Sequence, residues 1–259
     1  MNLAVAGGTG TVGRYVVEEG RAAGHQLTVL SRSTGFDLSD DGVEPALRRA
    51  LEGVDALIDT TDPHTIARKS ATVFFERVTR RLQAAGSASG VLRLVTLSIV
   101  GIDRVPGWGY YLAKQRQEQV AREGPIPVTV VRATQFHEFP GEILRTTRFG
   151  PLALMMRMRT QPIAARTVAQ HLVEAAADPS ADAGTTLQIA GPTTYELVDL
   201  ARRFLARRRV RALVVPLHLP GAAGRAFRGG AVLPAPGVPT IGPTFDQWLD
   251  SEDALSLAA

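Results

Sequence analysis

The stretch that decides the fold is Asn2-Leu3-Ala4-Val5-Ala6, followed at once by Gly7-Gly8-Thr9-Gly10-Thr11-Val12-Gly13. The first five residues form a short, mainly apolar run, which is typical of a strand buried on both faces of a parallel sheet. A helical pattern runs from residue 11 to about residue 23, and Gly24 stands where a helix stop is expected. The glycines therefore predict a tight turn between a buried strand and a helix.

This turn matches G-x-G-x-x-G through Gly8, Gly10 and Gly13, and a second glycine pattern starts at Gly7. Glycines are needed where the chain turns tightly and its backbone approaches a pyrophosphate, while the helix N-terminus offers N–H groups and a positive dipole end. A purely structural glycine turn is the alternative, but the position between strand and helix favours a dinucleotide site. The predicted contacts are Gly7, Gly8, Thr9, Gly10, Thr11, Val12 and Gly13.

Strand and helix patterns alternate through the first half of the chain. Further strands are predicted at residues 26–30, 54–59, 91–97 and 126–132, with a very brief one near residues 36–38. Helices are predicted at residues 43–51, 65–85 and 110–123. Alternation at this spacing predicts βαβ units with right-handed crossovers. The predicted fold class is α/β, a doubly wound, Rossmann-like parallel sheet.

After residue 132 the patterns are less regular. Helices are predicted near residues 138–148, 167–177 and 195–206, strands at 159–163, 186–190 and 210–215, and residues 216–243 are rich in Gly and Pro. Ligands of doubly wound sheets bind beyond the carboxyl ends of the strands. We therefore predict a single NAD(P)-binding Rossmann domain over residues 1–259, with a cofactor-binding core at 1–132 and a small, partly irregular substrate-side portion at 133–259.

Composition excludes several functions. The 259 residues include no Cys, so there is no disulfide, thiolate nucleophile or Cys-ligated metal, and the five histidines lack metal-ligand spacing. The start does not resemble a signal peptide and no apolar run is long enough to span a bilayer, which predicts a cytoplasmic protein without a membrane partner. The basic run at residues 202–211 has few aromatic neighbours and predicts a solvated helix face, not a nucleic-acid site. The expected partner is a small-molecule substrate, and the expected state is a monomer or homodimer.

The second predicted strand ends in Ser31-Arg32-Ser33, about where a dinucleotide site reads the ribose 2′ position. An acid there would bind a ribose hydroxyl, whereas Arg32 can pair bidentately with a 2′-phosphate, with donors from Ser31 and Ser33 and assistance from Arg14. This predicts NADP(H) as the cofactor. The alternative is that Arg32 is a solvated residue of an Arg-rich chain. We also place Asp37 and Leu38 beside the adenine.

A candidate catalytic group follows the strand at residues 91–97. Ser98 comes at its carboxyl end, and Tyr110 and Lys114 lie four residues apart on one face of the next helix. A ketone that accepts hydride needs a proton, which a tyrosine supplies if an ammonium and the nicotinamide lower the pKa of its phenol. Ser98 would donate to the carbonyl oxygen. Tyr111 is the rival acid, and chance placement on a structural helix is the other alternative.

These residues, in this order and approximate spacing, resemble the short-chain dehydrogenase/reductase superfamily, and the phrase at residues 132–139 is similar to its atypical NmrA-like branch. The resemblance implies Tyr110 as general acid/base, Lys114 on the nicotinamide ribose, and Ser98 on the substrate. It also implies that Thr134, Gln135 and Phe136 flank the nicotinamide.

One segment departs from the family pattern. The chain has Asp59-Thr60-Thr61-Asp62-Pro63 where the usual members have an Asn-Ala-Gly turn, so their Asn-mediated proton relay is absent or replaced. We place Thr60 and Thr61 among the cofactor contacts. The predicted substrate contacts are Trp108, Tyr111, His137 and Met155.

The predicted function is an NADP(H)-dependent oxidoreductase that transfers hydride between the nicotinamide and a ketone or related carbonyl. The apolar candidates indicate a hydrophobic substrate, for example a quinone or a polyketide-like ketone. Two alternatives remain open: a redox-neutral enzyme of the same fold (epimerase, dehydratase or cyclase), and a non-catalytic regulator that senses NADPH.

Overall fold

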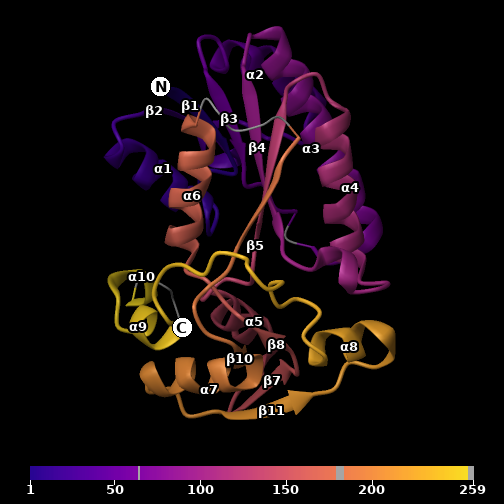
Figure 1. Cartoon of the computed structure of the whole chain (residues 1–259), viewed down its shortest axis with the longest axis vertical. Coiled ribbons are helices and arrows are strands. Elements are labelled where there is room, and N and C mark those ends of the chain that lie inside the picture. Colours follow the sequence, from indigo (N-terminus) through magenta and orange to yellow (C-terminus); the bar gives the residue numbers. More distant parts are fainter. Residues whose placement is uncertain (64, 179–183, 256–259) are drawn as a thin grey trace. The chain divides into compact units, whose positions relative to one another are not determined.

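The computed structural model describes residues 1–63, 65–178 and 184–255, and the chain divides into two compact units (Figure 1). Unit 1 comprises Met1–Ile99, Gly109–Arg132 and Val168–Leu187. Unit 2 comprises Val100–Trp108, Ala133–Thr167 and Gln188–Ala259. The domain limits expected from the sequence, with a change at residue 132, stay a prediction.

The central sheet has six strands in the order β2-β1-β3-β4-β5-β9. The strands are β1 (Asn2–Ala6), β2 (Gln26–Leu30), β3 (Ala56–Asp59), β4 (Arg93–Ile99), β5 (Val128–Ala133) and β9 (Thr186–Ile189). The pairs β1–β2, β1–β3 and β3–β4 are parallel. The strand order reverses between β1 and β3, which is the switch point where ligands of doubly wound folds bind.

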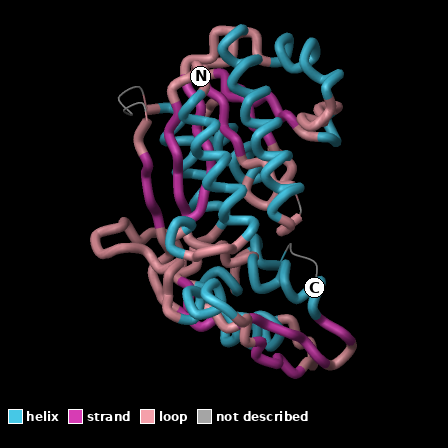
Figure 2. The backbone as a smooth tube through the Cα atoms, turned by 90° about the vertical axis from the view of Figure 1, so that its right-hand side faces the viewer, coloured by secondary structure: helices cyan, strands magenta, loops and turns pink. Residues whose placement is uncertain are grey.

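Helices accompany the strands of the sheet (Figure 2). They are α1 (Gly13–Ala22), α2 (Glu44–Ala50), α3 (Arg68–Ala88), α4 (Gly109–Glu123) and α6 (Ala165–Ala177). Leu3 through Ala6 of β1 are fully buried, as expected for a strand covered on both faces. The predicted doubly wound α/β class is confirmed.

Two local predictions differ from the structure. Residues 36–38 form no strand, because Asp37 instead accepts hydrogen bonds from the backbone N–H and the hydroxyl of Ser39. The second difference is that β4 continues to Ile99, so Ser98 lies inside the strand and not beyond its end. The ladder continues because Val100 N–H donates to the Ala133 carbonyl.

Unit 2 contains two small sheets and several helices. The three-stranded sheet has the order β11-β7-β6, and β8 pairs with β10. The strands are β6 (Arg148–Phe149), β7 (Leu152–Met156), β8 (Arg159–Thr160), β10 (Tyr195–Glu196) and β11 (Leu213–Leu217). The helices are α5 (Phe139–Thr147), α7 (Leu197–Arg207), α8 (Gly221–Arg228), α9 (Phe245–Leu249) and α10 (Glu252–Leu255).

Among the described helices, none combines the length and the apolar character needed to cross a membrane.

Candidate functional site

The glycine turn after β1 forms a backbone cradle. Gly7 has φ of 77°, and a Cβ on it would lie 2.9 Å from the Thr60 carbonyl oxygen. A Cβ on Gly13 would lie 2.1 Å from the Gly7 oxygen, so the start of α1 crosses the turn at a distance that only glycine permits. Gly10 N–H donates to the Gly7 oxygen and closes the turn.

The N-terminus of α1 is suited to an anion. Within the residues that the structure describes, it has no side-chain cap and no acidic residue in its first turn. Its N–H groups and positive dipole end therefore face no carboxylate from the helix itself. The bare glycine cradle and this helix end together fit the diphosphate of a dinucleotide. The residues at the turn could thus hold the cofactor that the sequence predicts.

The predicted 2′-phosphate site lies beside this turn. Gly7 N–H donates to the Leu30 carbonyl, which joins the turn to the end of β2. Arg32 follows in a short 3-10 helix and is exposed. The Ser31 hydroxyl contacts the hydroxyls of Ser33 and Thr34, so it already has protein partners.

Two neighbouring predictions have a defined environment. Hydrogen bonds from Ser39 hold the pKa of Asp37 below its usual value, with smaller contributions from the charges of Arg32 and Arg81. The Arg14 guanidinium lies 4.5 Å from the centre of the Tyr15 ring and donates to the Tyr15 hydroxyl. Leu38 is buried in the core beneath this edge.

The phenol of Tyr110 faces the loop after β3. Its hydroxyl donates a 2.5 Å hydrogen bond to Asp62 Oδ2, and its ring packs edge-on against Phe75 of α3. The same loop contacts the glycine turn, because the N–H and the hydroxyl of Thr60 both donate to the Ala6 carbonyl. The loop after β3 therefore has Thr60 next to the residue that precedes the glycine turn, and Asp62, two residues further on, bonded to Tyr110.

Lys114 follows Tyr110 by one turn of α4 and is buried. Its ammonium donates to the Leu97 carbonyl and to Gln117 Oε1, and lies 4.8 Å from the centre of the Phe75 ring. Burial lowers the pKa of Lys114, opposed by the charges of Asp59, Asp62 and Glu118. The predicted contact of Lys114 with a ribose stays a prediction.

The network continues to the end of β3. Gln117 Nε2 donates to Asp59 Oδ2, and the Asp59 Oδ1 atom accepts from the N–H and the hydroxyl of Thr61. Thr61 is buried in this arrangement. The loop that replaces the Asn-Ala-Gly turn is thus tied to α4 twice, through Asp59–Gln117 and through Asp62–Tyr110.

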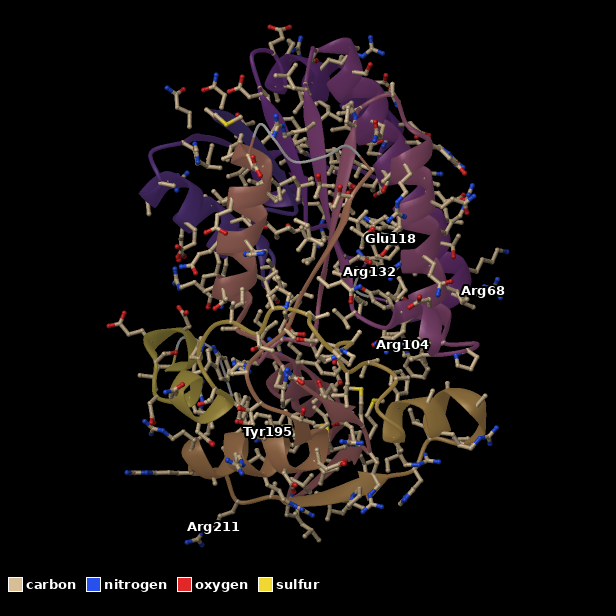
Figure 3. All side chains as sticks on the ribbon, viewed as in Figure 1. Arg68, Arg104, Glu118, Arg132, Tyr195 and Arg211 are labelled. Carbon is tan, nitrogen blue, oxygen red and sulfur yellow. The ribbon has the colours of Figure 1, made fainter. Side chains whose placement is uncertain are left out.

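Ser98 belongs to a second buried group. Its hydroxyl donates a 2.6 Å hydrogen bond to Glu118 Oε1, and Arg132 of β5 holds both Glu118 oxygens at 2.8 Å (Figure 3). Burial raises the pKa of Glu118, but hydrogen bonds from Arg132 and Ser98 and the charges of Arg132 and Arg122 hold it below its usual value. The structure does not bring the Ser98 hydroxyl to Tyr110.

Several members of these networks were missed in the sequence. Asp59, Asp62, Gln117 and Glu118 were not singled out as site residues. A usable signal existed on α4, where Tyr110, Lys114, Gln117 and Glu118 recur at helical spacing on one face. Polar side chains on the face of a helix that packs on a sheet indicate a hydrogen-bonded buried network.

The remaining predicted residues lie in unit 2, apart from Tyr111, which is buried in unit 1 and has its ring centre 6.4 Å from that of Tyr110. Gln135 Oε1 accepts from the Thr160 hydroxyl, and Phe136 forms a bridge to Ile163. Met155 is fully buried and Trp108 packs edge-on against Phe227. Thr134 is buried as well.

His137 of unit 2 is fully buried beside Phe245 and Trp248, and contacts the Pro243 carbonyl through Nε2. Burial lowers its pKa to about 4, against the opposite effect of the Pro243 hydrogen bond. His137 is therefore a neutral core residue near neutral pH.

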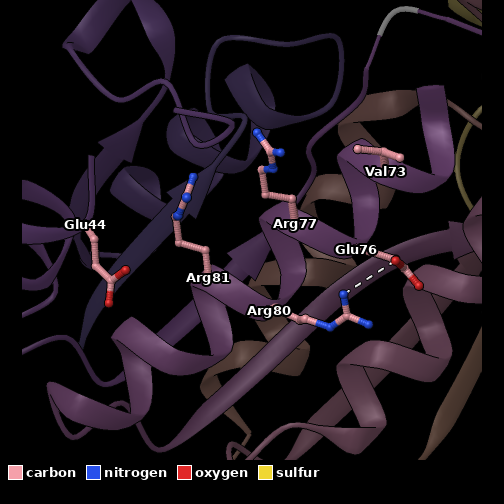
Figure 4. Close-up of a pocket in the computed structure, with 6 residues that line it drawn as sticks. All are labelled: Glu44, Val73, Glu76, Arg77, Arg80 and Arg81. Atoms are coloured by element: carbon pink, nitrogen blue, oxygen red, sulfur yellow. Dashed lines mark hydrogen bonds and ion pairs between the residues drawn. The ribbon is translucent and has the colours of Figure 1, made fainter. Parts of the chain in front are cut away.

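A shallow hollow of about 470 Å³ lies on the outer side of α2 and α3 (Figure 4). Its three arginines already have protein partners, since Arg77 donates to the Ser39 carbonyl, Arg81 to the Leu38 carbonyl and Arg80 to Glu76. It contains none of the predicted site residues.

The glycine turn at the switch point of a six-stranded sheet is the arrangement of a dinucleotide-binding Rossmann protein. A family model described as NAD(P)H-binding matches residues 7–179. The chain belongs to this NAD(P)H-binding family.

One curated relative is the (4-alkanoyl-5-oxo-2,5-dihydrofuran-3-yl)methyl phosphate reductase of Streptomyces griseus, which is 34% identical over 144 residues. This alignment covers 52% of the present chain and 48% of the relative, so the match spans about half the length of that protein.

Solved structures share the fold. A short-chain dehydrogenase/reductase superfamily protein from Agrobacterium tumefaciens with bound NAD is 20% identical, with a TM-score of 0.68 over 98% of this chain and 96% of that one. The UDP-N-acetylglucosamine 4-epimerase of Bacillus cereus is 16% identical, with a TM-score of 0.71 over 99% and 96%. The Citrobacter sp. triphenylmethane reductase complexed with NADP(H) is 16% identical, with a TM-score of 0.65 over 97% and 96%.

Proposed function

We propose that the protein is an NADP(H)-dependent oxidoreductase that reduces a carbonyl or carbonyl-activated substrate, with Tyr110 as the proton donor. The observation that carries this proposal is the hydrogen bond between Tyr110 and Asp62. Asp62 lies on the loop after β3, which also borders the glycine turn. The Streptomyces griseus relative, named as a reductase of a phosphorylated alkanoyl-dihydrofuranone, supports reduction as the reaction.

Each group has a separate role in the proposed reaction. When bound, NADPH would supply the hydride for the electrophilic carbon. The Tyr110 hydroxyl gives its proton to the atom on which negative charge develops, in general acid catalysis. Asp62 is exposed and accepts the Tyr110 hydrogen bond, so it connects the phenol with solvent and offers the route by which Tyr110 regains its proton.

Lys114 acts in this proposal as a positioning residue. Its ammonium lies over the Phe75 ring, and the Tyr110 ring packs against the same phenylalanine. The hydrogen bond of Lys114 to the Leu97 carbonyl ties α4 to β4, and the hydrogen bond of Gln117 to Asp59 ties α4 to the end of β3. These two ties fix the position of Tyr110 on α4.

The role of Ser98 on the substrate requires its hydroxyl to turn from Glu118 to the carbonyl oxygen. Ser98→Ala tests this role. A substrate contact predicts a lower kcat/KM with unchanged NADPH affinity, whereas a purely structural Ser98 predicts a change in the free energy of unfolding only.

The cofactor preference rests on Arg32. It is exposed at the end of β2, beside the glycine turn, and no carboxylate takes the place where a ribose hydroxyl would be read. An exposed guanidinium there favours a 2′-phosphate, because it can form two parallel charge-assisted hydrogen bonds to it.

The experiment is consumption of NADPH with a panel of quinones, hydrophobic ketones and alkanoyl-dihydrofuranone phosphates, using wild type and Tyr110→Phe. We expect consumption by wild type, loss in Tyr110→Phe, and equal NADPH affinity of both proteins. Full activity of Tyr110→Phe overturns the proton-donor role. Product formation without net NADPH consumption would instead identify a redox-neutral enzyme.

A further inference from the structure

The three-stranded sheet of unit 2 has one face that is apolar throughout. Parallel pairing sets Leu213, Val215 and Leu217 of β11 opposite Leu152, Leu154 and Met156 of β7, and antiparallel pairing sets Phe149 of β6 opposite Leu152. Because side chains alternate along a strand, these seven share one face. We call this set the apolar sheet face.

The apolar sheet face is open to solvent. Phe149 is 68% exposed, Leu213 66% and Leu152 47%, and Leu154 and Leu217 are exposed as well. The opposite side of the sheet holds the buried Ala153, Met155 and Val214, where α5 and α7 pack. A solvated sheet face normally carries polar side chains, so a continuous exposed apolar face indicates a surface that another partner covers.

Exposed arginines lie next to the strands of this sheet. Arg211 is exposed two residues before β11 and extends away from the ribbon in Figure 3, and Arg157 is exposed directly after β7. Arg148 of β6 and the nearby Arg145 are also exposed, but Arg148 pairs with Ala153 and therefore belongs to the side of the sheet where α5 and α7 pack. Across the described part of the chain, no salt bridge engages any of these four arginines.

Acidic residues are absent from the same segments. The sequence has no Asp or Glu between Glu142 and Glu174, or between Asp199 and Asp246, and these stretches supply all three strands of the sheet. A hollow of about 160 Å³ between α5 and α7 is lined by Arg145, Arg148 and Arg208 over an apolar floor that includes Phe204. It offers positive charge next to β6.

We propose that the apolar sheet face and its arginines dock the protein on the surface of an anionic lipid bilayer. Apolar side chains would enter the boundary between headgroups and acyl chains, while the arginines bind the negatively charged headgroups. A second copy of the chain is a poorer occupant, since a two-fold interface on this face would bring the arginines of both copies together. Such binding is peripheral and differs from the expectation from the sequence, which assigns no membrane partner.

The test is flotation with vesicles of phosphatidylcholine alone and of phosphatidylcholine mixed with phosphatidylglycerol. The protein should float with the anionic vesicles and not with the neutral ones. Arg211→Glu should weaken this binding roughly tenfold, because the arginine is attracted to the anionic headgroups and a glutamate at the same position is repelled by them. Arg49→Glu, at an exposed arginine of α2, is the matched control and should bind like wild type.

The apolar contribution has its own pair of variants. Leu213→Ser combined with Leu217→Ser should abolish flotation, whereas Leu92→Ser, which changes a leucine of unit 1 that is 64% exposed, should leave it unchanged. All three positions are exposed, so thermal unfolding should stay close to wild type.

Three results overturn the proposal. The first is the absence of flotation with anionic vesicles. The second is flotation that the Leu213→Ser/Leu217→Ser protein retains. The third is a dimer in light scattering that the same double substitution converts to a monomer, because a second copy would then cover this face.

Discussion

The Tyr110 hydroxyl donates a 2.5 Å hydrogen bond to Asp62 Oδ2, and this pair joins the first turn of α4 to the loop after β3. The neighbouring pair Asp59–Gln117 joins α4 to the end of β3 through buried atoms. The first pair is accessible and the second is buried. In the proposed mechanism the accessible pair transfers protons, while the buried pair supports the structure.

Replacement of Tyr110 by Phe should remove the proton donor and leave the ring packing on Phe75 intact. We expect kcat to fall by roughly 10²- to 10⁴-fold, the usual contribution of general acid catalysis, with unchanged NADPH affinity in fluorescence titration. Tyr111→Phe is the matched control and should retain most activity. A comparable loss in both variants would point to a defect of the helix, not of the proton donor.

Asp62→Asn tests the proton route. The amide oxygen can still accept the Tyr110 hydrogen bond, but the side chain can no longer take up a proton. We expect a lower kcat and a larger solvent isotope effect on kcat, at unchanged KM. Asp41→Asn, at an exposed aspartate paired with Arg81, is the control. An isotope effect equal to that of wild type would count against Asp62 as the relay.

Arg32→Ala should weaken NADPH binding by more than tenfold, about 1.4 kcal/mol or more, while NADH binding changes little. The reason is that only NADPH carries the 2′-phosphate. Calorimetric titration of both cofactors measures the difference, with Arg49→Ala as control. Equal losses for the two cofactors would contradict a 2′-phosphate site at Arg32.

Glu118→Gln should destabilise the protein by about 3 kcal/mol, because a buried pair that loses one partner leaves Arg132 without its carboxylate. Urea unfolding at neutral pH measures this, and Glu123→Gln on the exposed side of α4 should have little effect. The folded-state pKa of Glu118 lies below the ordinary 4.5, so its stabilisation is present above that value and is lost as pH falls through the folded pKa. The gap between wild type and Glu118→Gln should therefore narrow in acid.

His137 should make unit 2 sensitive to acid. Burial lowers its pKa to about 4 in the folded protein, so the unfolded chain binds the proton more readily as pH falls below the ordinary value of 6.5. Stability is full above that value and declines toward pH 4, by up to roughly 3 kcal/mol. In His137→Phe the unfolding free energy should change less over this range. An identical pH dependence in both proteins would show that another group is responsible.

The first half of the fold could be predicted because its signals are local. Short sequence segments are enough to predict the strand β1, the glycine turn and the alternation of β2 to β5 with helices. The observed bounds of these elements differ from the predicted ones by a few residues. The strand predicted at residues 36–38 does not form, because the Asp37 side chain makes local hydrogen bonds instead. The pattern of apolar residues gives no indication of such bonds.

Unit 2 was harder to predict. No strand is predicted over residues 152–156, and this segment forms β7 because β11 pairs with it from sixty residues away. Helix α8 lies within the Gly- and Pro-rich stretch and was not expected. The candidate site was hard to predict for the same reason. Ser98 bonds to Glu118 and Tyr110 bonds to Asp62, and such pairings depend on tertiary contacts that the sequence does not show.

The central claim is that Tyr110 delivers a proton beside the nicotinamide. The most direct test is a crystal structure of the NADP⁺ complex, with the distance measured from the Tyr110 hydroxyl to nicotinamide C4. The proposal predicts that the hydroxyl stands within reach of a carbonyl placed on C4, about one hydrogen bond away, and that the 2′-phosphate lies on Arg32. A nicotinamide face covered by protein, or a Tyr110 ring directed away from C4, would contradict the account and indicate a cofactor-sensing protein.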